Sequence, residues 1–362
     1  MAGNGPDGAQ RAGGVVLGFA EEAEPWRLRS SQFPSKAGGR PAWLSQCALP
    51  SPAELRCDKC HAPCALLLQV YAPIADRERA FHRTLFVFCC RSPACYSHND
   101  SRCFKVFRSQ LPRRNEFYSY DPPPEEEPVE SDVDAGVLRS GLKLCRVCGC
   151  LGPKSCSRCH SATYCSKEHQ TMDWRAAHKN ECAGKESSGA GGLNTFLFPE
   201  FELVTEPEDL PDNDDEQSDA PEQMRGNLSS DCGSLQNDEW EEKELEDMAM
   251  HETEDSKVFQ RFKRRTAPEP HQVLRYCRGG SPLWVSAEHV PSADTIPDCA
   301  CGDKRVFEFQ VMPQLLNHLH VDTPDVSIDW GTLAVYSCEY SCDQGNSYWP
   351  EFIWKQDFTG AH

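Results

Sequence analysis

A short motif occurs twice in this chain of 362 residues. The sequence GGRPAWLS at residues 38–45 returns as GGSPLWVS at residues 279–286, and each copy is followed by a closely spaced cysteine pair. Each copy then continues with a Gln-Val dipeptide inside an apolar run and with a second cysteine pair. An internal repeat indicates one supersecondary unit that is used more than once. The sequence therefore predicts two related halves, each with a set of four cysteines.

The cysteines also indicate the class of protein. A chain of this length can bury a sizeable core, so its 21 cysteines are not needed as disulfide cross-links. The first 25 residues lack the apolar stretch of an export signal, and the most apolar run, residues 65–75, is too short to span a bilayer. In a reducing compartment, closely spaced cysteine pairs are typical of zinc sites. We therefore expect a zinc protein of the cytoplasm and nucleus that has no membrane partner.

The clearest metal motif lies between residues 145 and 182, where eight Cys and His side chains form four pairs. The members of each pair are separated by two or three residues, and tetrahedral zinc needs two such pairs, so eight ligands predict two zinc ions. With Tyr164 before the fifth ligand and Trp174 between the sixth and seventh, the segment resembles a MYND zinc finger. The resemblance implies interleaved ligands: Cys145, Cys148, Cys165 and His169 for one zinc, and Cys156, Cys159, His178 and Cys182 for the other.

The finger departs from the usual MYND ligand pattern at two cysteine or histidine positions, and its predicted zinc sites limit its chemistry. Most MYND fingers have cysteine where this chain has His169, and Cys150 is left without a role. Four-ligand zinc sites are closed, so we expect a structural and not a catalytic role for the metal. The resemblance implies binding of proline-containing peptides or corepressors. Residues 143–185 carry eight Lys and Arg against three acids, which keeps DNA binding as an alternative.

Each repeated half is predicted to hold one further zinc. Two strands with a cysteine pair at each base resemble a zinc ribbon. Cys89 and Cys90 are adjacent, but the repeat aligns Cys90 with Cys338 and Cys89 with Ser337, so Cys90 is the expected ligand. The predicted sites are Cys57, Cys60, Cys90 and Cys95 in the first half, and Cys299, Cys301, Cys338 and Cys342 in the second. The alternative is that these cysteines are buried as small apolar side chains.

The net charge of −19 comes from one stretch of the chain. Between residues 202 and 256 there are 21 acidic residues and only two basic ones, Arg225 and Lys243. Such a segment cannot bury enough apolar surface to fold, so we expect disorder there. It is either a solvated spacer or an attractor for a basic partner.

The fold class predicted from these features is α+β, mainly β. Two duplicated zinc-ribbon-like β halves would pack as one composite body, with an inserted MYND finger and a disordered acidic tract. We expect strands at residues 15–19 and 104–111 and a short helix at 315–319. The predicted parts are a disordered N-terminus (1–14), the N-terminal half (15–120), an acidic proline-rich linker (121–142), the finger (143–185), an acidic disordered insert (186–239), a helix (240–266) and the C-terminal half (267–362).

Several long stretches resemble the programmed cell death protein 2 family, namely residues 24–44, 111–120, 196–203, 271–284 and 304–319 together with the finger. The resemblance implies a dedicated chaperone that captures a basic protein of the small ribosomal subunit and escorts it into assembly. It also implies links to cell death, proliferation and DNA binding. The sequence contains no phosphate-binding loop, deaminase motif or nucleophile arrangement, so we expect no enzymatic activity.

Overall fold

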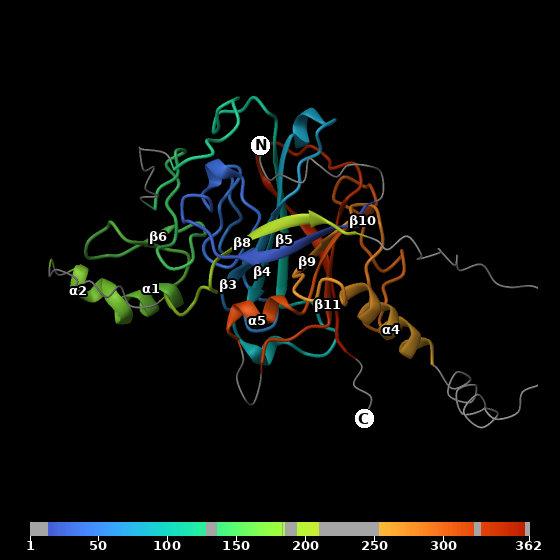
Figure 1. The fold of residues 1–362 in the computed structure, drawn as a ribbon. Coiled ribbons are helices and arrows are strands. Elements are labelled where there is room, and N and C mark those ends of the chain that lie inside the picture. The colour runs from blue at the N-terminus through green and yellow to red at the C-terminus, as the bar shows by residue number, and fades with distance from the viewer. Residues whose placement is uncertain are drawn as a thin grey trace, which may run out of the picture.

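The computed structural model describes residues 14–127, 136–182, 184, 194–209, 253–321 and 327–358 (Figure 1). Ten strands close into one barrel in the order β1-β8-β2-β3-β4-β5-β12-β11-β10-β9, which confirms a mainly β protein. The barrel strands are β1 (Val16–Glu21), β2 (Lys36–Ala37), β3 (Cys64–Tyr71), β4 (His82–Cys90), β5 (Phe104–Leu111), β8 (Phe201–Pro207), β9 (Leu274–Tyr276), β10 (Arg305–Val311), β11 (Thr332–Cys338) and β12 (Tyr348–Gln356). The finger adds a small hairpin of β6 (Lys154–Ser155) and β7 (Thr163–Tyr164).

The two halves of the sequence form matching parts of this barrel. Strands β2 to β5 come from the first half and β9 to β12 from the second, and the halves meet where β5 and β12 pair antiparallel. The pairing register repeats, because a β-bulge lies between Leu66 and Leu68 in β3 and between Phe307 and Phe309 in β10. The repeat in the sequence therefore encodes two copies of one four-stranded unit.

The repeated glutamine holds the repeated turn in place. Gln69 accepts a hydrogen bond from the backbone N–H of Ala42 (2.9 Å) and donates to the carbonyl oxygen of Pro34 (3.1 Å). Gln310 likewise accepts from the N–H of Leu283 (2.6 Å) and donates to the Leu283 carbonyl oxygen (2.9 Å). Both glutamines are buried, where an unpaired amide would cost free energy. This bonding explains why a polar residue recurs inside both apolar runs.

The closed barrel corrects the predicted architecture of two packed zinc-ribbon-like halves. Each half does contain a hairpin with cysteine pairs at its base, but its strands continue into a sheet that both halves share. The reason is burial: all nine residues of β4 and all seven of β11 are buried. A separate two-stranded ribbon cannot bury both faces and both edges of such strands.

Strand β8 corrects the predicted acidic disordered insert of residues 186–239. Residues 201–207 within it pair with β1 over six residues and with β2 over two, and so join these two strands of the first half, while β1 itself pairs with β9 of the second half. Two buried cations hold the acids that flank this strand: Lys36 on β2 pairs with Glu200, and Arg275 on β9 pairs with Glu208 at 2.7 Å. The acidic composition therefore has a structural use here. Residues 210–239 lie outside the described residues.

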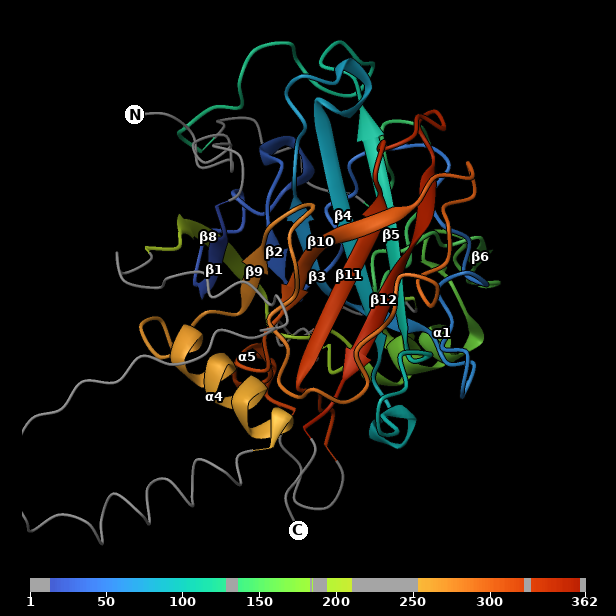
Figure 2. The ribbon, with the colours of Figure 1, turned by 90° about the vertical axis from the view of Figure 1, so that its right-hand side faces the viewer.

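The helices are short and lie outside the barrel (Figures 1 and 2). Helix α4 spans Glu254–Thr266, inside the predicted helix 240–266, of which residues 240–252 lie outside the described part of the chain. The side chain of Thr253 caps it by accepting from the backbone N–H of Ser256 at 3.1 Å. Helix α5, Leu315–Leu319, matches the prediction. None of the described helices combines the length and apolarity needed to cross a membrane.

A fully buried ion pair joins the two halves inside the barrel. Arg83 on β4 makes two hydrogen bonds to Glu308 on β10, at 2.7 and 2.8 Å. The hydroxyl of Tyr276 donates to the same carboxylate at 2.8 Å, and that of Ser337 also donates to it. Burial opposes ionisation of Glu308, but the Arg83 guanidinium outweighs burial and lowers the pKa of Glu308 to about 2. Arg278 of the second half adds a contact to Glu308 at 3.2 Å, but the buried Arg83 guanidinium meets this carboxylate only when both halves are in place.

Candidate metal centres

The structure gathers the predicted metal ligands into four separate clusters. Within each cluster the four ligand atoms lie within 4.8 Å of one another. The clusters are Cys57, Cys60, Cys90 and Cys95; Cys145, Cys148, Cys165 and His169; Cys156, Cys159, His178 and Cys182; and Cys299, Cys301, Cys338 and Cys342. The finger ligands interleave, and Cys90 lies in its cluster while Cys89 does not. Zinc binding itself stays a prediction.

The distances within the clusters fit tetrahedral zinc. The sulfur atoms of Cys60 and Cys90 are 3.5 Å apart, and those of Cys301 and Cys338 are 3.7 Å apart. A tetrahedral zinc with bonds of about 2.3 Å to sulfur places its ligands roughly 3.8 Å from one another. All of the described cysteines are free thiols. The donor set and its geometry are therefore compatible with zinc at all four places.

Each cluster begins with the same backbone turn. The residue after the second cysteine has a positive φ of 59° at His61, 72° at Gly149, 58° at His160 and 93° at Gly302. Its backbone N–H donates to the carbonyl oxygen of the first cysteine at 2.8 to 2.9 Å in all four turns. The turn forms even where one residue separates the cysteines instead of two. Gly and His are residues that tolerate positive φ, so this was a sequence signal for the sites that cysteine spacing alone missed.

In the finger, a helical segment supplies two of the candidate ligands, and a third, Cys182, follows it directly. Helix α1 (Lys167–Asp173) continues through a π-helical turn (Trp174–His178) into α2 (Lys179–Glu181). The Nδ1 atom of His169 lies 3.1 Å from the sulfur of Cys165, and Nε2 of His178 lies 3.5 Å from that of Cys159. The other ring nitrogen of each histidine is buried without a partner among the described residues. The ring orientations thus identify Nδ1 of His169 and Nε2 of His178 as the candidate ligand atoms.

Each half also places a cation at or near the other half's cysteine cluster. Arg108 on β5 donates to the sulfur of Cys342 at 3.4 Å and to the Cys342 carbonyl oxygen at 3.2 Å. Lys355 takes the equivalent place on β12, and its Nζ donates at 3.3 Å to the carbonyl oxygen of Ser97, close to Cys95. Both cations are buried. Side chains around a metal site tune its ligands, so we expect each half to influence the candidate site of the other.

Three cysteines lie beside the first cluster without joining it. Cys64, Cys89 and Cys103 are buried, and burial raises the pKa of Cys89 to about 12. Burial also raises the pKa of the other two thiols. These groups are neutral and fill the end of the barrel as small apolar side chains. Cys150, the spare cysteine of the finger, is buried as well, whereas Cys232 lies outside the described residues.

The finger packs on the outer face of the first half, where the green segment of Figure 1 lies against the blue one. The indole N–H of Trp43 donates to the carbonyl oxygen of Gly149 at 2.8 Å, and Arg40 donates to that of Arg146 at 2.6 Å. Val147 of the finger belongs to the same hydrophobic cluster as Trp43. Trp43 is buried, whereas its repeat partner Trp284 is only half-buried.

Substitution Trp43→Phe is expected to loosen the finger. It keeps an aromatic ring but removes the hydrogen bond to Gly149, which contributes about 1 kcal/mol. Amide hydrogen exchange of residues 145–182 should then become roughly fivefold faster, measured by mass spectrometry. The matched change Trp284→Phe should leave these amides unaffected, because Trp284 lies on the other half. Equal exchange in both variants would show that the finger is held by other contacts.

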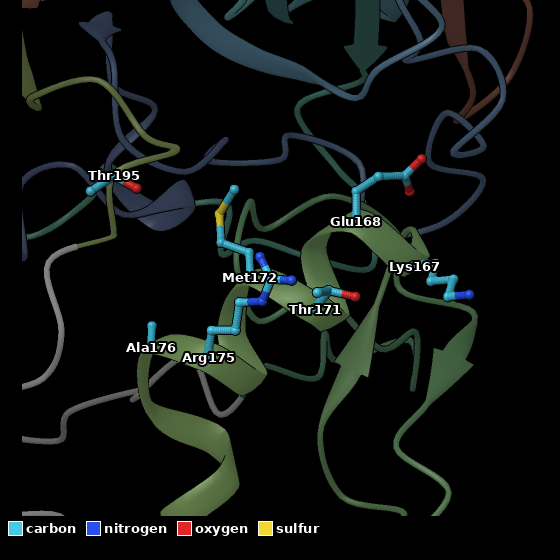
Figure 3. A pocket seen from close by; sticks show the side chains of 7 residues that line it. All are labelled: Lys167, Glu168, Thr171, Met172, Arg175, Ala176 and Thr195. Carbon is cyan, nitrogen blue, oxygen red and sulfur yellow. The ribbon is translucent and has the colours of Figure 1, made fainter.

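An open groove runs along the exposed side of the finger helix. Lys167, Met172 and Arg175 line it from the helical segment, and Thr195 faces them from the chain that leads into β8 (Figure 3). Met172 is 36% exposed. The groove combines an apolar centre with two cations and one acid, Glu168.

Comparisons with known proteins agree with this organisation. Residues 14–125 match the N-terminal domain of programmed cell death protein 2, residues 256–357 its C-terminal putative domain, and residues 145–182 a MYND finger. Programmed cell death protein 2 of Mus musculus is 53% identical, with 97% of this chain and 98% of that protein covered. The related "Programmed cell death protein 2-like" of Homo sapiens is 31% identical over 87% of each chain.

A more distant relative is the "Probable 20S rRNA accumulation protein 4" of Schizosaccharomyces pombe. It is 23% identical, with 90% of this chain and 92% of that protein covered. No solved structure matches. The two family domains correspond to the two halves of the barrel, and the finger lies between them in the sequence. This chain belongs to the programmed cell death protein 2 family.

Proposed function

We propose that this protein is a non-enzymatic, zinc-binding chaperone for a basic protein of the small ribosomal subunit. In this proposal it captures the newly made client and escorts it into ribosome assembly, and it acts in both cytoplasm and nucleus. The observation that carries the proposal is the relationship to the fission yeast protein, whose name concerns accumulation of a 20S rRNA. That relationship extends over most of both chains and so includes both barrel halves.

The charge distribution supports a basic client. The acidic surplus lies in one stretch, while the remainder of the chain is balanced. A ribosomal protein without its RNA carries a strong positive charge and binds nucleic acids without specificity. A chain that carries an acidic segment in addition to a folded barrel suits temporary shielding of such a protein.

Deletion of residues 210–252 is expected to weaken capture of the client and to flatten its salt dependence. The deletion spares β8 and α4, which belong to the folded body. Basic proteins extracted from purified small ribosomal subunits serve as the probe, and retention on the immobilised full chain is measured from 50 mM to 500 mM salt. A variant that keeps the length but replaces the acids of this segment with Asn and Gln is the control. If the deletion variant retains the basic proteins as well as the wild-type chain does at every salt concentration, the shielding role is refuted.

A second candidate is a regulator of transcription, proliferation or cell death that acts through the finger. The groove along α1 favours it, because an apolar centre with charged side chains of both signs beside it suits a short peptide, such as a proline-containing corepressor segment. Binding of a proline-rich peptide is the test of this alternative. The alternative is supported if the substitution Met172→Glu abolishes this binding and Cys57→Ser preserves it. The surplus of basic residues in the finger also allows DNA binding. A gel-shift assay tests this: full-length protein should slow the migration of a labelled DNA duplex at 150 mM salt.

A further inference from the structure

The internal symmetry of the barrel leaves one aromatic face without the cover that its counterpart has. In the first half, Trp43 and the outward rings of Phe86 and Phe88 lie beneath the finger and are buried. By register, Trp284, Ala334 and Tyr336 occupy the same places in the second half. In Figure 2 the strands β10, β11 and β12 face the viewer with no helix or strand in front of them.

This second-half face carries a continuous row of rings. The centroids of Phe307 and Tyr336 are 6.0 Å apart, those of Tyr336 and Phe352 6.1 Å, and those of Phe352 and Trp354 6.3 Å. His289 stacks on Trp354 at 4.4 Å and ends the row. The row crosses from β10 through β11 to β12. Trp284, Phe352 and Trp354 are each only half-buried.

The cover over this face is a thin loop. Every residue from 287 to 298 is exposed apart from the half-buried Pro291 and Ile296, and Val290 is 44% exposed. Trp354 Nε1 donates to the carbonyl oxygen of His289. The indole N–H of Trp284 has no acceptor within the described part of the chain, whereas its counterpart Trp43 uses this group to bind the finger. Trp284 is therefore positioned to donate to a carbonyl oxygen of another protein.

The charge around the face indicates the chemistry of its partner. Residues 287–304 carry four acids, Glu288, Asp294, Asp298 and Asp303, against the single cation Lys304. Glu288 and Asp294 are exposed and make no ion pair among the described residues. Carboxylates beside accessible Trp and Phe rings suit Arg and Lys side chains, which pair with the acids and stack on the rings.

We propose that the outer face of β10–β12, with the loop of residues 287–298, is a docking surface for an extended basic segment of a partner protein. The segment donates Arg or Lys to Glu288 and Asp294, lays its side chains on Trp354, and accepts a hydrogen bond from Trp284. This surface deepens the proposed function, on which it rests, because it places the client opposite the finger and beside the second metal centre.

Three variants of the full chain test the surface with the extracted basic proteins of small ribosomal subunits as probe. The charge reversal Glu288→Lys with Asp294→Lys is expected to weaken retention about tenfold at 100 mM salt. Trp284→Phe keeps the ring and loses the donor, with an expected weakening of about fivefold. Trp354→Ala removes a central ring, with an expected weakening of about thirtyfold. Unchanged thermal unfolding of the charge-reversal variant and Trp284→Phe shows that both are folded.

The matched control reverses two acids elsewhere, Glu22→Lys with Glu24→Lys, which are exposed on the first half and make no ion pair among the described residues. It should bind as wild type does. Wild-type retention in all three surface variants overturns the docking surface but leaves the proposed function standing. A wild-type chain that retains no basic ribosomal protein overturns both. If sedimentation instead shows a concentration-dependent dimer that the substitution Trp284→Phe dissociates, the face is assigned to a second copy of this chain. That result overturns the proposal that it binds a basic segment.

Discussion

Native mass spectrometry of the purified chain is expected to show four bound zinc ions, and their removal is expected to unfold the protein. Structural zinc contributes on the order of 10 kcal/mol to small domains of this kind, because the site does not exist in the unfolded chain. Two of the clusters tie hairpins of the barrel together at its ends, so loss of metal there affects the shared sheet. Chelation followed by circular dichroism measures the unfolding.

A pair of adjacent cysteines provides the control for metal content. Cys90→Ser should remove one zinc and destabilise the barrel, whereas Cys89→Ala should keep all four, although both cysteines are fully buried on β4. Within the finger, Cys165→Ser should lose one zinc and Cys150→Ala none. A count of two ions in the wild-type protein would restrict metal to the finger and would falsify the sites in the two halves.

Substitution Arg83→Met is expected to destabilise the protein by about 3 kcal/mol, because it removes the two hydrogen bonds of the guanidinium to the buried Glu308 and leaves that carboxylate with Arg278, at 3.2 Å, as its cationic partner. Both side chains are fully buried, so no solvent replaces the lost guanidinium. Urea unfolding followed by tryptophan fluorescence measures the free energy. The double variant with Glu308→Met should recover much of this loss, because an apolar pair leaves no buried charge.

The exposed pair Arg79–Asp343 offers a matched comparison. It also joins the two halves, at 2.7 Å, but its side chains are 50% and 43% exposed. Arg79→Met should therefore change the free energy of unfolding by less than about 1 kcal/mol. Equal losses in Arg79→Met and Arg83→Met would show that charge between the halves matters and burial does not.

The same buried pair predicts an acid limit to stability. The folded-state pKa of Glu308, about 2, is depressed below the ordinary value of 4.5. Its stabilisation is therefore present above pH 4.5 and is lost as the pH falls toward 2. The variant that lacks both Arg83 and Glu308 should not show this component of acid unfolding.

Local patterns in the sequence predicted the metal ligands, because the two members of each pair lie within a few residues of one another. The repeat even separated Cys90 from Cys89, since only one of them has a cysteine counterpart in the second half. The second pair of each cluster comes from a more distant segment. Which pairs share a cluster was predicted from the resemblance to MYND fingers and from the internal repeat. Turns at His61 and Gly302 were readable in principle, because a residue of positive φ directly follows the cysteines.

The closure of the barrel could not be predicted from local sequence patterns. Strand β8 lies within an acidic stretch, and it is a strand because it pairs with β1 and β2, which are both distant in the sequence. The buried pair of Arg83 and Glu308 likewise joins residues 225 positions apart, and neither side chain resembles a core residue in isolation. The contact of Trp43 with the finger could not be read either, because the equivalent Trp284 has the same local sequence and no such contact.

The pairing of β5 with β12 has a consequence for the kinetics of folding. Residues 112–347 separate these neighbours in the sequence, so β5 keeps an open hydrogen-bonding edge until almost the whole chain is available. Such long-range closure is slow, since loop entropy is lost before the contacts form. A first half that waits with an unpaired edge is exposed to strand exchange with another copy or to aggregation. We expect the yield of refolding to fall steeply as the protein concentration rises.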